Sequence, residues 1–356
     1  MKVFLERKYQ KNIATSRSFK GQYSLLCITG LLLISFLSAQ KLSAQDLRYS
    51  QWHAAQTTVN PAFAGAFGRP RIILNFRDQW PMMPQSYVSY RAAMDAYVPK
   101  IRSGLGVTID QDNQGDNLLQ STRFGMQYMY QARLGAEWAL NFGLSLDYRQ
   151  YRINWQDIQF YDQISLLTGF NDVSGNPNPT AEPAPGKNQV GFVDLGSGLL
   201  LYNKSAYLGF SFNHITNPVV SFYGTDNSEL PGSLNAQAGV FIGGKREKDL
   251  LVNPYALWSH QAGFNQIQTG VYVKKSLLLT GLAVKHNTVG LSDVVLLAGV
   301  SQEMIRFAYS YDVSTGPLAG LTGGAHEVSL VITLKENAGR AFRNSQKSML
   351  DCPSIL

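Results

Sequence analysis

The feature that most constrains this chain is an alternation of apolar and polar side chains that recurs between about residues 71 and 335. Because successive side chains of a strand point to opposite faces, a period of two predicts strands with one apolar and one polar face. A soluble sandwich shows the same alternation, so the compartment has to be decided from strand lengths and connections. The pattern is clearest at 136–153, where Trp138, Leu140, Phe142, Leu144, Leu146 and Tyr148 alternate with Glu137, Asn141, Ser145, Asp147 and Arg149.

The pattern divides into about fourteen segments, which we predict to be strands. Most are about ten residues long, which suits a tilted crossing of a bilayer. They lie at 71–80, 85–98, 102–111, 119–134, 136–153, 190–202, 205–214, 232–242, 250–260, 265–275, 277–286, 293–302, 304–314 and 325–335.

The connections between these strands are sorted by length. Those after even-numbered strands are short, at 99–101, 135, 203–204, 243–249, 276 and 303, whereas several after odd-numbered strands are longer, at 112–118, 154–189, 215–231 and 315–324. Short turns on one side and long loops on the other are typical of a bacterial outer-membrane barrel with both termini periplasmic. We therefore expect an all-β fold, a transmembrane antiparallel β-barrel in the outer membrane of a Gram-negative bacterium, with a soluble β protein as the alternative. Tyr and Trp near the strand ends favour the membrane, among them Tyr97, Tyr202, Tyr207 and Tyr272, although β propensity alone also places aromatics in strands.

The first 44 residues resemble a secretory signal peptide. An apolar run at 25–37 follows six basic residues, and Ser-Ala-Gln occurs at 38–40 and 43–45, so we expect cleavage near Ala39 or Ala44. The alternative is an uncleaved anchor, but thirteen residues of helix span only about 20 Å. Removing residues 1–39 takes away the six basic residues and Glu6, which lowers the formal net charge from +7 to +2. We therefore expect no nucleic-acid partner, because such binding needs a clustered basic face.

Three segments lie outside the strand pattern. Residues 45–70 are too poor in charge for a linker and lack clean alternation, so they must be packed. A fourteen-stranded barrel has room for them, and we expect a plug inside the lumen anchored by Trp52, Phe63 and Phe67. A mobile periplasmic arm is the alternative. The loop at 154–189 is expected on the outer side, with 158–167 packed over the barrel mouth. The tail at 336–356 is expected in the periplasm, and it carries Cys352, the single cysteine of the mature chain.

The sequence shows no constellation typical of catalysis or of metal or cofactor binding. The five histidines are scattered, no cysteine pair accompanies them, and Gly-x-Ser-x-Gly is absent. Gly104 and Gly106 lack the helix of a nucleotide loop, and we expect them to leave room for the plug. We predict no enzyme, no cofactor and no metal; an outer-membrane hydrolase assembled from several strands is the alternative.

Several short motifs resemble the PorP/SprF family. They are Val59–Gly65 (VNPAFAG), Arg77–Trp80 (RDQW), Ser89-Tyr90, Asp95, Gly104–Gly106 with Asp110, and Phe160–Asp162. The family consists of outer-membrane proteins of the type IX secretion and gliding-motility systems, and the resemblance covers nearly all of the mature chain. Asn60, Pro61 and Ala62 are also similar to the lumenal hatch of FadL-type channels, which share the fourteen-strand plan.

The resemblance implies a non-enzymatic role in the export or surface anchoring of a large adhesin with a type IX sorting domain. Periplasmic secretion-machine or peptidoglycan-binding components are the other partners it implies, besides the lipid of the outer membrane. The FadL likeness implies an alternative function, a passive channel for hydrophobic small molecules. Asn60, Pro61 and Ala62 would form a turn of the hatch, although Asn-Pro is also common in plain turns.

Overall fold

The computed structural model describes residues 46–334 except 225–227, 244–248, 289, 291, 303 and 317–318. The predictions for the signal peptide and for the tail at 336–356 concern residues outside this part of the chain. Within it, none of the helices has the length and apolar character needed to cross a membrane.

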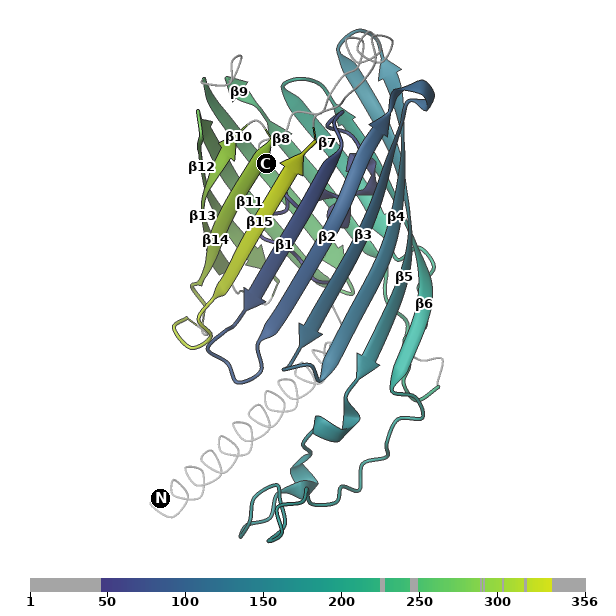
Figure 1. Cartoon of the computed structure of the whole chain (residues 1–356), viewed down its shortest axis with the longest axis vertical. Helices are drawn as coiled ribbons and strands as arrows, with labels where there is room; N and C mark the ends of the chain where they lie inside the picture. The colour runs from purple at the N-terminus through teal and green to yellow at the C-terminus, as the bar shows by residue number, and fades with distance from the viewer. Residues whose placement is uncertain are drawn as a thin grey trace, which may run out of the picture. The chain divides into compact units, whose positions relative to one another are not determined.

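The strands form one antiparallel sheet that closes on itself (Figure 1). Strands that follow one another along the chain pair with each other, and β1 pairs with β15, which closes the barrel; the exception is the short β9, which pairs only with β10. The strands are β1 (Arg71–Gln79), β2 (Tyr87–Val98), β3 (Ser103–Gln114), β4 (Leu119–Leu134), β5 (Trp138–Ile153), β6 (Gln189–Tyr202), β7 (Ala206–Asn213), β8 (Ser233–Val240), β9 (Ile242–Gly243), β10 (Leu250–Gln261), β11 (Phe264–Lys275), β12 (Leu278–Asn287), β13 (Ser292–Gln302), β14 (Ile305–Ser314) and β15 (Ala325–Thr333).

These fifteen segments occupy fourteen positions around the barrel. β8 and β9 both pair with β10, and Phe241 between them still donates its backbone N–H to the Ser205 carbonyl beside β7. The two segments are therefore one interrupted strand. The prediction of an antiparallel barrel of about fourteen strands is confirmed, and the strand ends agree within a few residues.

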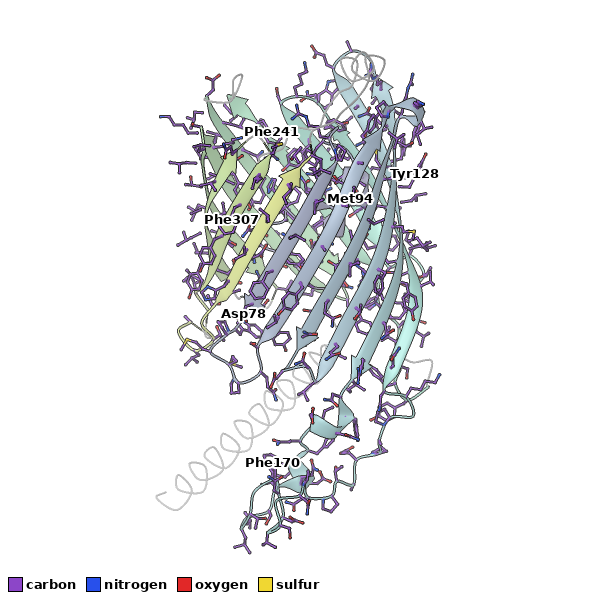
Figure 2. The ribbon with its side chains drawn as sticks, viewed as in Figure 1. Asp78, Met94, Tyr128, Phe170, Phe241 and Phe307 are labelled. Carbon is purple, nitrogen blue, oxygen red and sulfur yellow. The ribbon has the colours of Figure 1, made fainter. Side chains whose placement is uncertain are left out.

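The two faces of the barrel differ in chemistry as the alternation predicted. In β5, Leu144 is 59% exposed and points outward, whereas Ser145 is buried on the inner face. Figure 2 shows the outward side chains, among them Met94, Tyr128 and Phe307, each 43% exposed. An apolar outer face and a polar lumen suit a barrel that is surrounded by lipid.

The Tyr and Trp side chains near the strand ends fall into two groups, and only one of them can lie at the membrane interface. Tyr90, Tyr128, Tyr130, Trp138, Tyr148 and Trp258 are exposed on the outside, where an interfacial belt is possible. Tyr97, Tyr202, Tyr207 and Tyr272 are instead buried on the inside, so a membrane-interface role is wrong for these four. Their rings fill the lumen.

The connections lie at two ends of different character. The turns after even-numbered strand positions are short, and Gly135 with φ 75° lies in one of them, between β4 and β5. At the opposite end, residues 154–188 between β5 and β6 form a long arm that carries the short 3-10 helices η3 (Trp155–Asp157) and η4 (Tyr161–Gln163) (Figure 1). The expectation that 158–167 pack over the barrel mouth is wrong, because Leu166 and Leu167 are 102% and 94% exposed.

Candidate functional site

The N-terminal segment (residues 46–70) crosses from one end of the barrel to the other. Asp46 contacts His214 and Arg149, which lie beside the long-loop ends of β7 and β5. At the other end Phe67 packs under the Arg71 guanidinium at 3.8 Å, where β1 begins next to the short turns. Asp46 therefore lies at the end opposite to the start of the barrel. The termini themselves are outside the described residues, so their expected periplasmic location stays a prediction.

The middle of the segment is buried against inward-facing aromatic side chains. Trp52 and Phe63 are 0% and 1% exposed, and the Trp52 ring lies 6.2 Å from Phe63 and 6.1 Å from Tyr207. The His53 ring meets the edge of Tyr272 at 4.6 Å and is buried. This histidine therefore contributes to the packing of the cluster. Further rings of the cluster are Phe241 and Tyr255.

The motif Asn60-Pro61-Ala62 attaches the segment to three strands. Asn60 caps the 3-10 helix η1 (Pro61–Phe63), which follows the helix α2 (Gln56–Val59), and its Oδ1 accepts a hydrogen bond from the Ala62 N–H at 2.9 Å. Its Nδ2 donates to the carbonyls of Leu199 in β6 and Phe210 in β7 at 3.0 and 3.2 Å. The Ala62 carbonyl accepts from Asn141 of β5 at 3.1 Å. The Asn60 side chain thus makes hydrogen bonds both within its own turn and to the barrel wall. The role of this motif as a hatch stays a prediction.

Glycines in the wall make this close approach possible. A Cβ at Gly104 would overlap the Ala64 carbonyl, and one at Gly143 would overlap the Ala62 backbone. A Cβ at Gly198 would overlap the Asn60 side chain. The expectation that Gly104 leaves room for the N-terminal segment is confirmed, because any side chain there would push the segment from the wall. At Gly106 a Cβ would first meet the Gln127 side chain of β4, and Ala64 of the segment only at 3.4 Å, an ordinary contact distance.

A buried cluster of charges surrounds Ser50. The Arg77 guanidinium contacts Asp312 and Glu327, each at 3.0 Å, and Lys285 Nζ lies 2.8 Å from Asp312. The Ser50 and Gln51 N–H groups donate to the two Glu327 carboxylate oxygens at 2.8 and 3.0 Å. Two cations thus balance two anions, as burial of charge requires.

Other residues of the sequence motifs form similar pairs on the inner wall. Asp95 accepts from Arg71 at 2.9 Å, and Asp110 accepts from both Arg91 and Arg123 at 2.8 Å. Arg91 also donates to Thr57 of the N-terminal segment at 2.6 Å. Asp95 and Asp110 thus join neighbouring strands of the wall, and Arg91 also ties the wall to the N-terminal segment.

His214 links Asp46, at the start of the N-terminal segment, to the barrel wall. Its Nε2 lies 2.6 Å from Asp46 Oδ2, and its Nδ1 lies 2.6 Å from Asp194 Oδ2. Carboxylates only accept hydrogen bonds, so both ring nitrogens donate and the imidazole is charged. Burial alone would lower the pKa of His214, but Asp46 and Asp194 outweigh it and raise the pKa to about 9. For Asp46, burial is outweighed by His214 and Arg149, which hold its pKa well below the ordinary value.

This linkage predicts a loss of stability at alkaline pH. The pKa of His214 is about 9 in the folded protein and near 6.5 in the unfolded chain. His214 therefore stabilises the folded state fully below about pH 6.5, and this stabilisation is lost as the pH rises through about 9. The lowered pKa of Asp46 has no effect in this range. Relative to His214→Gln, the free energy of unfolding of the wild type should fall by roughly 3 kcal/mol between pH 6 and 9.5. Urea titrations in detergent followed by tryptophan fluorescence measure this, and parallel pH curves for the two proteins would contradict it.

Polar cavities flank the start of the segment. The largest of these three, about 400 Å³, lies at the long-loop end. Two smaller ones of about 70 and 30 Å³ lie on opposite sides of Leu47, toward β3–β5 and toward β7–β10. Residues 46–49 therefore divide the outer half of the lumen. The lining of the largest includes Asp46, Arg48, Arg77, Asp112, Lys285 and Asp293.

The sequence predicted part of this site and missed part of it. It singled out Asn60, Pro61, Ala62, Trp52, Phe63 and Phe67, all of which contact the wall or one another. It did not indicate Ser50, Lys285 or His214, because their partners are far away in the chain. The spacing between His214 and Asp46, 168 residues, carries no local signal.

Similarity to solved structures is low in sequence. The chain is similar to the P. putida toluene transporter TodX, with 12% identity over 79% of this chain and 94% of that chain and a TM-score of 0.45. The Ralstonia pickettii toluene transporter TbuX shares 8% identity over 78% of this chain and 92% of that chain, with a TM-score of 0.44. A Pseudomonas aeruginosa FadL homologue shares 12% identity over 78% of this chain and 93% of that chain, with a TM-score of 0.42. At these values nothing about ligands is transferred to this chain. No curated protein matches it.

A family model gives the identification. The model described as type IX secretion system membrane protein PorP/SprF matches residues 41–332. The match includes the N-terminal segment and nearly the whole barrel, and therefore both parts of the site described above. The chain belongs to the PorP/SprF family of type IX secretion system membrane proteins.

Proposed function

We propose that this outer-membrane barrel supports the export of a large secreted adhesin with a type IX sorting domain, its anchoring at the cell surface, or both. The observation that carries the proposal is the family match over residues 41–332. Periplasmic secretion-machine or peptidoglycan-binding components are the second class of partner we propose.

The filled lumen supports an accessory role more than a conduit for the adhesin. The N-terminal segment is tied to the wall by the Ser50 charge cluster, by Asn60 and by the Trp52 aromatic cluster. A folded or even an extended protein would have to displace all three to pass. Contacts made on the loops outside the lumen require no such displacement.

The alternative of a passive channel for hydrophobic small molecules receives less support from the lumen. Such sites are mostly lined by apolar and aromatic side chains. The cavities at the long-loop end are bounded by charged groups, including Arg48, Arg77 and Lys285. An apolar solute entering from that side would leave these groups without water.

Affinity purification of the tagged full-length protein from the native outer membrane tests the proposal. In mild detergent, mass spectrometry should find a large secreted protein with a sorting domain enriched about tenfold or more over a control purification of an unrelated tagged barrel. Cells that lack this protein should also show less of that secreted protein at their surface.

Recovery of the barrel alone, in repeated preparations and after cross-linking, would count against anchoring. Uptake of toluene by liposomes that contain only the purified barrel would then favour the channel. The two readouts are independent, because the first needs a partner and the second excludes one.

A further inference from the structure

The arm between β5 and β6 is ordered mainly by polar contacts. Gln163, buried at 9% exposure, donates to the Asn178 carbonyl at 2.5 Å, and Asn178 returns a hydrogen bond to the Gln163 carbonyl at 2.8 Å. Ser165 and Gly169 exchange two backbone hydrogen bonds across a tight turn. These hydrogen bonds therefore give the arm a defined conformation with a turn at its tip.

Further contacts fix the second half of the arm and its base. Asp172 Oδ1 accepts from the N–H groups of Ser174 and Asn176 at 2.8 and 2.9 Å, and these backbone hydrogen bonds lower its pKa. Asp162 accepts from Thr180 Oγ1 at 3.0 Å. Tyr223, in the connection between β7 and β8, donates to the Pro183 carbonyl at 3.2 Å and holds the returning strand of the arm.

Several apolar side chains of the arm are turned outward. Leu166 and Leu167 are 102% and 94% exposed at the Ser165–Gly169 turn, and Val173 is 93% exposed at the neighbouring turn. Tyr161 is 90% exposed. In Figure 2 the labelled Phe170 marks this part of the arm, well away from the strands. Ordered apolar side chains clustered at a tip are typical of a protein-binding surface.

The charge of the arm is predominantly acidic. Residues 154–188 contain Asp157, Asp162, Asp172 and Glu182, all exposed, and one basic residue, Lys187, just before β6. Acidic groups are repelled by anionic lipid headgroups, so a membrane surface is a poor match for this tip. A protein surface with basic side chains around an apolar pocket is complementary to it.

We propose that the arm is a docking element whose apolar tip inserts into a pocket rimmed by Lys and Arg on a secreted surface protein. Leu166 and Leu167 are the anchors, and Glu182 with Asp157 provides the charge that steers the partner. The inference rests on the proposed function for the class of partner, but the tip and its charge are independent of the family match.

Site-specific photo-cross-linking in living cells tests the proposal. A photoreactive phenylalanine analogue at position 167 of the full-length protein should cross-link to a secreted protein, and the cross-linked peptide should be apolar with Lys or Arg beside it. The matched position is 321 in the connection between β14 and β15, where Leu321 is 66% exposed, and it should give at least about tenfold less product.

Substitutions provide the second measurement. Leu166→Ser with Leu167→Ser should lower the amount of the partner that copurifies by about tenfold or more, whereas Leu321→Ser should leave it unchanged. Glu182→Lys should weaken copurification and reduce its sensitivity to salt. These side chains lie outside the barrel, so heat-modifiable migration on gels should confirm that each variant still folds.

Three results would overturn the docking role. They are cross-links to lipid alone, a cross-linked pocket lined by Asp and Glu, and unchanged copurification for the double leucine variant. If the wild type retains a secreted protein and the double variant retains it equally, the docking inference fails and the proposed function survives. If the wild type retains none, the anchoring part of the proposed function fails, and the docking inference fails with it.

Discussion

Replacing Arg77 with methionine is expected to lower the free energy of unfolding by about 3–5 kcal/mol, because it leaves a buried carboxylate without its partner. Arg77 is 5% exposed and neutralises both Asp312 and Glu327, which are 2% and 0% exposed. After the substitution Lys285 alone faces both carboxylates. Urea unfolding of the full-length protein in lipid vesicles measures the loss.

The controls for this prediction separate charge from packing. Arg133→Met removes an exposed arginine of β4 and should change stability by no more than about 0.5 kcal/mol. Adding Glu327→Gln to Arg77→Met should restore part of the loss, since one of the unpaired charges is then removed. Equal stability of Arg77→Met and Arg133→Met would show that the buried cluster does not stabilise the fold.

Replacing Leu144 with arginine should cost about 2–4 kcal/mol, because Leu144 lies near the middle of β5 on the outer face, where lipid surrounds it. A charge at this depth has no partner in hydrocarbon. The measurement is again urea unfolding in vesicles, with folding yield into the same vesicles as a second readout.

Leu134→Arg is the matched control for membrane depth. Leu134 is the last residue of β4 and is 49% exposed, so its side chain lies next to the turn and the cost should be about 0–1 kcal/mol. Equal losses of unfolding free energy for Leu144→Arg and Leu134→Arg would mean that the cost of a charge on the outer face does not depend on its depth in the membrane. Equal tolerance of Leu144→Arg and Ser145→Arg would count against the assigned faces.

The strands of this barrel were predictable because their signal is local. A period of two in the sequence requires only that neighbouring side chains point to opposite faces, so Leu144 and Ser145 could be assigned without knowing the strand partners. The order of the barrel followed from the sorting of short and long connections. The same local information located the turn at Asn60 and Pro61, which needs only the residues around it.

The aromatic side chains show where this local information ends. Tyr130 lies near the end of β4 and Tyr202 is the last residue of β6, yet the first is on the outer surface and the second inside the lumen. Tyrosine suits a membrane interface and a packed interior equally well, because its ring is apolar and its hydroxyl is polar. Composition and position along a strand therefore did not separate the two.

The sequence by itself determined which residues form strands, which face each side chain occupies, and that a charge-poor segment precedes the barrel. The tertiary structure alone decided which charges meet: Ser50 reaches Glu327 across 277 residues, and Asp46 reaches His214 across 168. It also decided that the arm carries its leucines outward. The physical reason is that alternation is set by adjacent residues, whereas these contacts exist only after the barrel has closed and brought distant strands around one segment.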